Sequence, residues 1–268
     1  MSRLFLALAL VATSACSSGG GDLNNLQENP KPLSTPIASQ SDPKTRIGDG
    51  QTIRASGVVI VAVDAYDETK DGKGVGDIFV QDPLQPAPKG TPWSGLRLYR
   101  PTKNPPDLEL APGMGVDLTG DYLAFTGPPG PETNKFKPLG LAQPQASNAS
   151  LTLTYEGRAP APIDLTPEDI RDPFVAMQYA SRLVRFKNVT LDSDFSLGRP
   201  EARTPIVVER TGKEETTGYL MVSSKFFPMH ETTALNPKKG TTYKSITGVL
   251  DFFYTFKLCP RSVADIEL

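Results

Sequence analysis

The stretch Gly115-Val116-Asp117-Leu118-Thr119-Gly120-Asp121-Tyr122-Leu123-Ala124-Phe125 decides the fold. Its apolar residues alternate with polar ones over the first half, and such alternation predicts a β-strand. Gly120 lies at the middle, and glycine inside a strand marks a bulge or a tight bend. The stretch therefore predicts a curved strand, which is the kind of strand that a small barrel needs.

Short apolar segments bounded by turn residues continue on both sides of this strand. With 26 prolines and 23 glycines along the chain, long helices are disfavoured, because proline removes a donor and clashes with the preceding turn. The further segments predicted as strands are 53–63, 77–83, 95–101, 136–141, 151–155, 183–191, 206–209, 219–222 and 243–256. One short helix is predicted after Thr166, with Pro167 at its first position and Asp169 in a capping box. The fold class is therefore all-β.

The two halves of the chain follow a similar plan. Each begins with a long strand and ends with a glycine-containing one, around Gly120 in the first half and Gly248 in the second. We predict two small β-barrels in tandem, with domains at 52–165 and 166–268 and the transition between Tyr155 and Leu183.

The N-terminal segment has the features of an export signal. Met1-Ser2-Arg3 is followed by an apolar run over 4–12 and by Thr13-Ser14-Ala15-Cys16, a run too short to span a bilayer. Residues 1–15 are predicted to be the signal peptide. Residues 16–51 contain many Ser, Gly, Asn and Pro residues and are predicted to form a flexible tether.

The cysteine at the predicted cut makes this segment resemble a bacterial lipoprotein signal, which implies that Cys16 carries the lipid and attaches the protein to a membrane. Thr13 departs from the leucine usual in such signals, and plain secretion is the alternative. Ser17 is not the aspartate that retains lipoproteins at the inner membrane. The resemblance therefore implies a lipid-anchored protein of the cell envelope, on the outer membrane of a Gram-negative bacterium.

Charge and cysteine content restrict the function classes. With 28 Lys and Arg against 30 Asp and Glu, the net charge of −2 argues against strong non-specific binding to nucleic acid, although a local basic face is compatible with it. If Cys16 is lipidated, Cys259 has no partner for a disulfide within the chain. Its apolar surroundings predict a buried, unreactive thiol.

The order of several strand motifs resembles a known group of domains. The motifs are Ile78-Phe79-Val80-Gln81-Asp82, Gly95-Leu96-Arg97-Leu98-Tyr99, Leu183-Val184-Arg185-Phe186-Lys187-Asn188-Val189-Thr190 and Leu258-Cys259-Pro260-Arg261-Ser262. In this order they are similar to the OB-like domains found beside secreted bacterial nucleases and on many cell-surface lipoproteins. The resemblance covers roughly residues 52–268 and implies two tandem OB-like barrels.

OB-like barrels bind ligands through aromatic platforms and cations on the second and third strands. The candidate ligand-binding residues are Phe79, Trp93, Arg97, Tyr99 and Arg100 in the first barrel, and Arg185 and Lys187 in the second. Strand alternation places Arg97 and Tyr99 on the same face, opposite Leu96 and Leu98, and predicts that this face is outside the barrel. The alternative interpretation is that these are ordinary solvent-facing residues of antiparallel strands.

The chain lacks the motifs of common hydrolases. It has one histidine, His230, and no nucleophile elbow or phosphate-binding glycine loop, so no catalytic residue is predicted and the chain is expected to be non-catalytic. No cofactor is expected. Calcium bound by Asp64, Asp67, Glu68 and Asp71 is the alternative to a solvated loop.

We therefore predict a lipid-anchored envelope protein with a non-catalytic binding role, whose ligand is an oligosaccharide or single-stranded nucleic acid. Two alternatives remain open. One is an assembly or scaffold protein that docks a protein partner in the envelope. The other is a metal-dependent hydrolase with an unrecognised carboxylate site.

Overall fold

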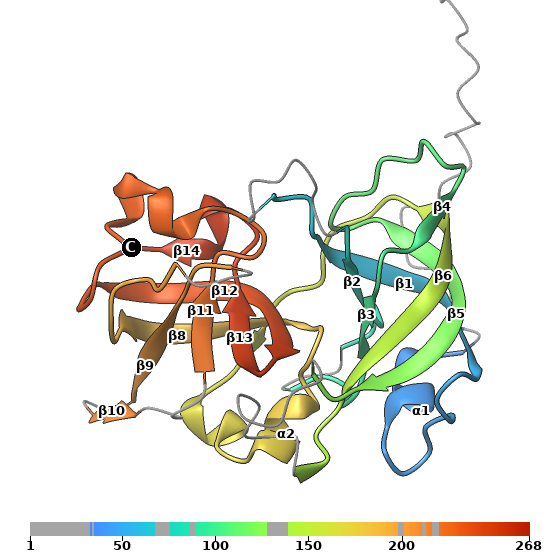
Figure 1. The fold of residues 1–268 in the computed structure, drawn as a ribbon, viewed down its shortest axis with the longest axis horizontal. Helices are drawn as coiled ribbons and strands as arrows, with labels where there is room; N and C mark the ends of the chain where they lie inside the picture. Colours follow the sequence, from blue (N-terminus) through green and yellow to red (C-terminus); the bar gives the residue numbers. More distant parts are fainter. Residues whose placement is uncertain are drawn as a thin grey trace, which may run out of the picture.

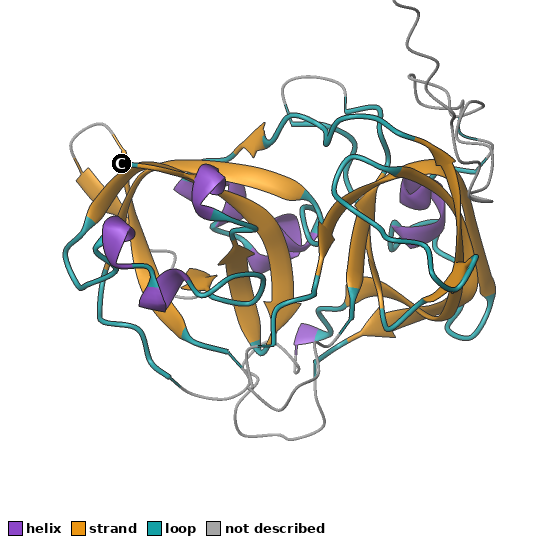
Figure 2. Ribbon diagram, turned by 90° about the horizontal axis from the view of Figure 1, so that it is seen from above, coloured by secondary structure: helices purple, strands orange, loops and turns teal. Residues whose placement is uncertain are grey.

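Two closed β-barrels lie side by side in the computed structural model, which describes residues 33, 35–67, 76–85, 89–127, 139–197, 201–210, 213–215 and 220–268. Figure 1 shows the first barrel on the right, in blue to green, and the second on the left, in yellow to red. Figure 2 shows two adjacent rings of strands with short helical turns around them. The predicted all-β, two-barrel fold is confirmed.

The first barrel is a ring of five strands. Its elements are β1 (Thr52–Val63), β2 (Ile78–Gln81), β3 (Gly95–Leu98), β4 (Thr102–Asn104), β5 (Gly115–Phe125) and β6 (Gln143–Tyr155). The hydrogen-bonded order is β3-β2-β1-β5-β6, and a parallel pairing of β3 with β6 closes the ring, while β4 extends it beside β6. The pairing of β5 with β6 shifts register between Thr119 and Asp121, which places the expected bend at Gly120.

The second barrel repeats this connectivity. Its elements are β7 (Ile163–Asp164), β8 (Leu183–Leu191), β9 (Arg203–Arg210), β10 (Lys213–Glu215), β11 (Leu220–Ser223), β12 (Thr242–Phe253), β13 (Thr255–Cys259) and β14 (Ile266–Glu267). The ring runs β8-β9-β11-β13-β12 and back to β8, and β11 pairs with β13 in parallel. In both barrels the third and fifth ring strands are therefore the parallel pair, as in a five-stranded OB barrel.

The helices in the described residues are few and short. They are α1 (Ile37–Ser41) and α2 (Pro173–Met177) and the 3-10 turns η3 (Pro167–Ile170), η4 (Met229–Glu231), η5 (Thr233–Leu235) and η6 (Val263–Asp265). The predicted capping box at Thr166 and Asp169 is present at the start of η3. Within the described ranges, no helix combines the length and apolar character that crossing a bilayer requires.

Three local predictions are corrected. The segment 243–256 is not one strand but the hairpin β12–β13, because Tyr254 adopts a positive φ of 68° and reverses the chain. Residues 139–141 form a turn rather than a strand, whereas 136–138 lie outside the described residues. The tether predicted over 16–51 ends earlier, because α1 packs on the first barrel with Ile37 fully buried in its core. Residues 1–32, including Cys16, lie outside the described part.

Each barrel has its own apolar core, and a third cluster joins the two. This cluster contains Val61, Ala62 and Phe79 from the first barrel and Leu183, Phe226, Val249 and Cys259 from the second.

The two sheets divide between Tyr155 and Ile163, within the predicted transition. Strand β7 already pairs with β8 of the second barrel, so this pairing begins just before the predicted limit at residue 165.

Candidate ligand-binding site

The expected ligand face of the first barrel is covered by the second barrel. Phe79 and Arg97 are cross-strand neighbours on β2 and β3, and their side chains are 0% and 7% exposed. Phe79 packs edge-to-face on Phe226, and the Lys225 ammonium lies 4.9 Å from its ring centroid. The prediction that Arg97 lies on an outer, solvent-facing surface is therefore wrong, and the candidate Phe79 is also buried.

Buried charges of both signs fill this interface. Arg97 donates through Nε to Asp77 Oδ2 at 2.8 Å, and through Nη2 to the same oxygen. Lys225 Nζ lies 2.8 Å from Asp251 Oδ2 and 3.9 Å from Asp64 Oδ2. Such pairs retain their charges in a buried site only because the partners are held close together.

The network shifts the pKa of Asp251. Burial by itself raises the pKa of this carboxyl, but the charges of Lys225, Arg97 and Lys257 lower it, and the net result lies well below the usual range. Lys257 in turn pairs with the buried Glu201. Asp251 is therefore ionised at neutral pH and stabilises the contact between the barrels.

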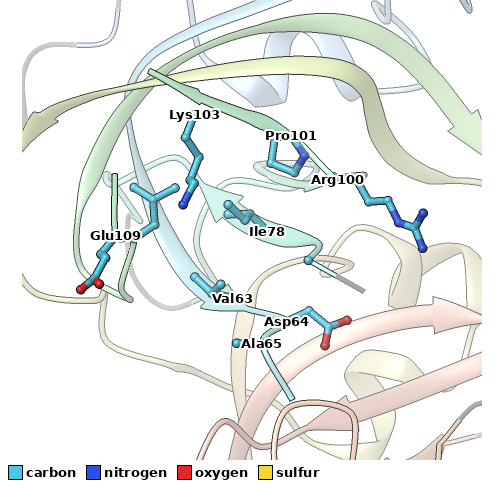
Figure 3. Close-up of a pocket in the computed structure, with 10 residues that line it drawn as sticks. Val63, Asp64, Ala65, Ile78, Arg100, Pro101, Lys103 and Glu109 are labelled. Carbon is cyan, nitrogen blue, oxygen red and sulfur yellow. The ribbon is translucent and has the colours of Figure 1, made fainter. Parts of the chain in front are cut away.

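The open cleft of the first barrel lies at the end of β3, beside the loop that follows β1. Its volume is about 910 Å³, and it is lined by Val63, Asp64, Ala65, Gly76, Ile78, Arg100, Pro101, Lys103, Glu109 and Leu110. Figure 3 shows these side chains around the ends of β1, β2 and β4. In an OB barrel, the loop between the first two strands borders the binding face, so this cleft has a position suited to ligand binding.

Two of the predicted ligand-binding residues, Tyr99 and Arg100, contact each other, and Arg100 lines this cleft. Tyr99 is 41% exposed, and the Arg100 guanidinium lies 5.4 Å from the centroid of the Tyr99 ring. Arg100 has a positive φ of 45°, and its backbone N–H donates to the buried Asp77 carboxylate at 3.3 Å. The chain therefore turns sharply after β3 and leaves an aromatic ring and a cation side by side on the surface.

Lys103 adds a second cation that the sequence analysis missed. It lies on the short strand β4, which pairs with β6, and its ammonium points toward the interior of the cleft in Figure 3. In the described part of the chain, no carboxylate forms an ion pair with Arg100 or Lys103. Lys103 comes after the strand that ends before Pro101. Its position next to Arg100 depends on the turn between the two residues, and strand alternation does not predict the shape of that turn.

The two cations predicted in the second barrel, unlike Arg100 and Lys103, form ion pairs with a described carboxylate. Arg185 Nε and Lys187 Nζ lie 2.6 Å and 3.0 Å from the two carboxylate oxygens of Asp164. The Arg185 hydrogen bond is the main reason that the pKa of Asp164 lies below its usual value. Asp164 therefore offsets one of the two positive charges on this surface, and the ligand-binding role of Arg185 and Lys187 stays a prediction.

Trp93 is separated from the other predicted residues. It lies in the turn before β3, half-buried against the core of the second barrel, and its backbone N–H donates to Gln178 O at 3.0 Å. Trp93 therefore belongs to a different surface from Tyr99 and Arg100.

The calcium alternative falls partly outside the described residues, which exclude Glu68 and Asp71. Asp64 is fully buried and faces Lys225, and Asp67 is half-buried. In the described ranges, no three His, Cys, Asp or Glu residues are grouped in a way that could hold a metal ion.

The predicted burial of Cys259 is confirmed, and this burial raises the pKa of the thiol.

Comparison with known proteins gives one weak sequence relative. The chain is 26% identical over 212 residues to endonuclease YhcR of Bacillus subtilis (strain 168), a match that covers 79% of this chain and 15% of that protein. The chain therefore spans a small part of the length of this relative. No protein-family profile matches the chain.

A solved structure gives a weaker likeness. A deletion mutant of the single-stranded DNA binding protein from Thermus aquaticus has 13% identity, with 79% of this chain and 93% of that chain covered, but the TM-score is 0.20. This likeness carries no argument about the fold or the ligand.

The similarity to an endonuclease contradicts the prediction that the chain is non-catalytic. The prediction rested on missing motifs, but the matched relative is named for cleaving nucleic acid. The expectation of a non-enzyme is therefore withdrawn.

Proposed function

We propose that this chain binds single-stranded nucleic acid at the open cleft of the first barrel and on the Tyr99 ring beside it, and that this binding serves cleavage of the nucleic acid. The observation that carries the proposal is the exposed Tyr99 ring with the Arg100 guanidinium 5.4 Å from its centroid. The partial similarity to an endonuclease supports nucleic acid over an oligosaccharide as the ligand.

The chemistry of the cleft suits a flexible, anionic, stacked ligand. A base can stack on the Tyr99 ring, and such stacking tolerates any sequence because every base has a π-face. Arg100 and Lys103 can each contact a phosphate, and neither charge is neutralised by a described carboxylate. A few phosphate contacts also fit a chain whose net charge is −2, because they need local rather than overall positive charge.

Binding is tested with the full chain and a labelled single-stranded oligonucleotide, followed by fluorescence anisotropy. We expect Tyr99→Ala, Arg100→Ala and Lys103→Ala to weaken binding, and Lys238→Ala, at an exposed lysine of the second barrel, to bind like the wild type. Each removed phosphate contact should lower the slope of log K against log salt by about 0.7. Equal binding by all four variants would exclude this cleft.

Cleavage by the chain itself is a second candidate, favoured by the match to an endonuclease. The test is incubation of labelled DNA and RNA with the full chain in the presence of Mg²⁺, Mn²⁺ or Ca²⁺, and again with EDTA. Metal-stimulated cleavage that copurifies with the chain would support it. Binding without turnover under all these conditions would count against catalysis by this chain.

We also propose that the protein acts at the bacterial cell envelope, attached through a lipid on Cys16. Support comes from the sequence of residues 1–16, an apolar run followed by a cysteine. Labelling with radioactive palmitate should mark the wild type but not Cys16→Ser. Equal labelling of the two proteins, or no labelling of either, would contradict the proposed anchor.

A further inference from the structure

A second groove lies between the barrels, on a surface distinct from the cleft at Arg100. Its volume is about 340 Å³, and its lining comes from the segment after α1, from the turn at Trp93, from β5 and the turn before β6, and from α2. Its walls carry aromatic and apolar side chains, including Trp93, Phe174 and Leu141. The groove is thus assembled from both barrels and exists only when they pack together.

The aromatic residues of this groove are held in accessible positions. Phe174 is 50% exposed on the short helix α2, where the Asp172 side chain accepts a hydrogen bond from its backbone N–H at 2.8 Å. Trp93 has a positive φ of 61°, a conformation that is uncommon for a bulky residue and costs free energy. The packing of Trp93 against the second barrel maintains this conformation and presents the indole to the groove.

Cations border the aromatic surface. Lys44 and Arg46 are exposed and line the groove from the segment that follows α1. The one carboxylate in the lining, Asp42, accepts a hydrogen bond from the backbone N–H of Lys44 at 2.9 Å. The buried Tyr122 also lines the groove. Burial raises the pKa of its hydroxyl, while its hydrogen bond with Arg46 opposes that rise.

We infer that this groove is a nucleotide subsite, in which a base stacks against Trp93 and Phe174 and the adjoining phosphate lies by Lys44 and Arg46. Aromatic faces next to cations are the combination that binds nucleic acid without sequence preference. The two cations and one carboxylate give the edge of the groove a net positive charge, which suits a phosphate. The aromatic and apolar walls suit a base, whereas an acidic peptide side chain would have no use for them. The inference extends the proposed function, on which it rests for the identity of the polymer, to a second point of contact.

Trp93 provides a direct test because it is the one tryptophan of the chain. The full chain is titrated with 5′-AMP, and separately with a labelled single-stranded oligonucleotide. Tryptophan fluorescence reports on this groove, while anisotropy of the label reports on binding anywhere on the protein. We expect saturable quenching by both ligands, and about tenfold weaker quenching affinity in Phe174→Ala, which removes one stacking surface.

Matched variants separate this groove from the other cleft. Arg46→Ala and Lys44→Ala should weaken AMP quenching, whereas Lys238→Ala and Arg100→Ala should leave it unchanged. Unfolding of each variant is followed by circular dichroism, so that loss of the fold is distinguished from loss of the site. Trp93→Phe keeps an aromatic ring and should retain oligonucleotide binding better than Trp93→Ala.

The outcomes for the two sites are distinguishable. Oligonucleotide binding with unchanged Trp93 fluorescence, and with wild-type affinity in Phe174→Ala, would overturn the groove inference and leave the proposed function standing. Saturable AMP quenching without oligonucleotide binding would support the groove and contradict the proposed function. No response to either ligand would overturn both.

Discussion

Gln143 of the first barrel donates a hydrogen bond from Nε2 to Oδ1 of Asp251 in the second barrel, over 3.1 Å, and both side chains are fully buried. The backbone N–H of Phe252 returns a hydrogen bond to Gln143 Oε1 at 3.1 Å. Asp251 also holds the ammonium of Lys225. This relationship joins the barrels through directional contacts between β6 and β12, beside the packing of Phe79 on Phe226 that covers the outer face of β2.

Gln143→Ala should destabilise the protein by about 2–3 kcal/mol, because it removes hydrogen bonds to a charged group and to a buried backbone amide. The measurement is urea denaturation at neutral pH, with Gln51→Ala as a control at an exposed glutamine. The control should change the free energy of unfolding by less than about 0.5 kcal/mol. Equal stability of the two variants would show that the Gln143 contacts contribute little to the interface.

Asp251→Asn should change how stability depends on pH. Because the folded-state pKa of Asp251 lies below its unfolded value, its contribution is complete above about pH 4, the unfolded pKa, and is lost as pH falls toward the folded pKa. At neutral pH the variant should be less stable by about 3 kcal/mol, since Lys225 then lacks its closest buried partner.

The check on Asp251 is denaturant unfolding from pH 7 to pH 2. The wild type should lose stability more steeply than Asp251→Asn below pH 4, so that the curves converge in acid. Parallel curves throughout this range would contradict the ionised state assigned to Asp251.

Arg97→Ala and Arg100→Ala should have opposite effects on folding and binding, although the two residues are three positions apart. Arg97 is buried against Asp77, and its loss leaves an uncompensated carboxylate, at a cost of about 3–5 kcal/mol in stability. Arg100 is exposed, so its loss should change stability by less than about 0.5 kcal/mol while weakening oligonucleotide binding. Thermal unfolding and anisotropy, measured on both variants, give the comparison. Weaker binding in a fully folded Arg97→Ala would instead restore Arg97 as a ligand contact.

Strand periodicity could predict which residues point away from a barrel core, but not what lies beyond them. Arg97 and Leu96 do point to opposite faces, as alternation requires. The outer face is buried all the same, because the second barrel covers it, and that contact joins residues more than 100 positions apart, such as Gln143 and Asp251. Alternation within one strand carries no information about such a distant partner.

The turns show the same limit at short range. The apolar residues of 243–256 gave no signal for a hairpin, since the reversal occurs at Tyr254, an aromatic residue in a left-handed conformation where glycine or asparagine is usual. Trp93 and Arg100 also have positive φ values. Their side chains reach the surface through these turns, and so the candidate sites depend on backbone conformations that residue type does not predict.

The docking of α1 on the first barrel should also hold the segment after it, which carries Lys44 and Arg46, at the groove. Ile37 is fully buried in the first core, and its backbone N–H donates to Asp82 Oδ1 at 2.9 Å. Ile37→Ala should cost about 2–4 kcal/mol in stability and expose residues 42–51 more often. Trypsin should then cleave after Lys44 and Arg46 faster than in the wild type or in Ser39→Ala, a change at an exposed position of the same helix. The same cleavage rate in all three proteins would mean that α1 is not what holds this segment against the barrel, and a flexible tether reaching residue 51 would then be the better description.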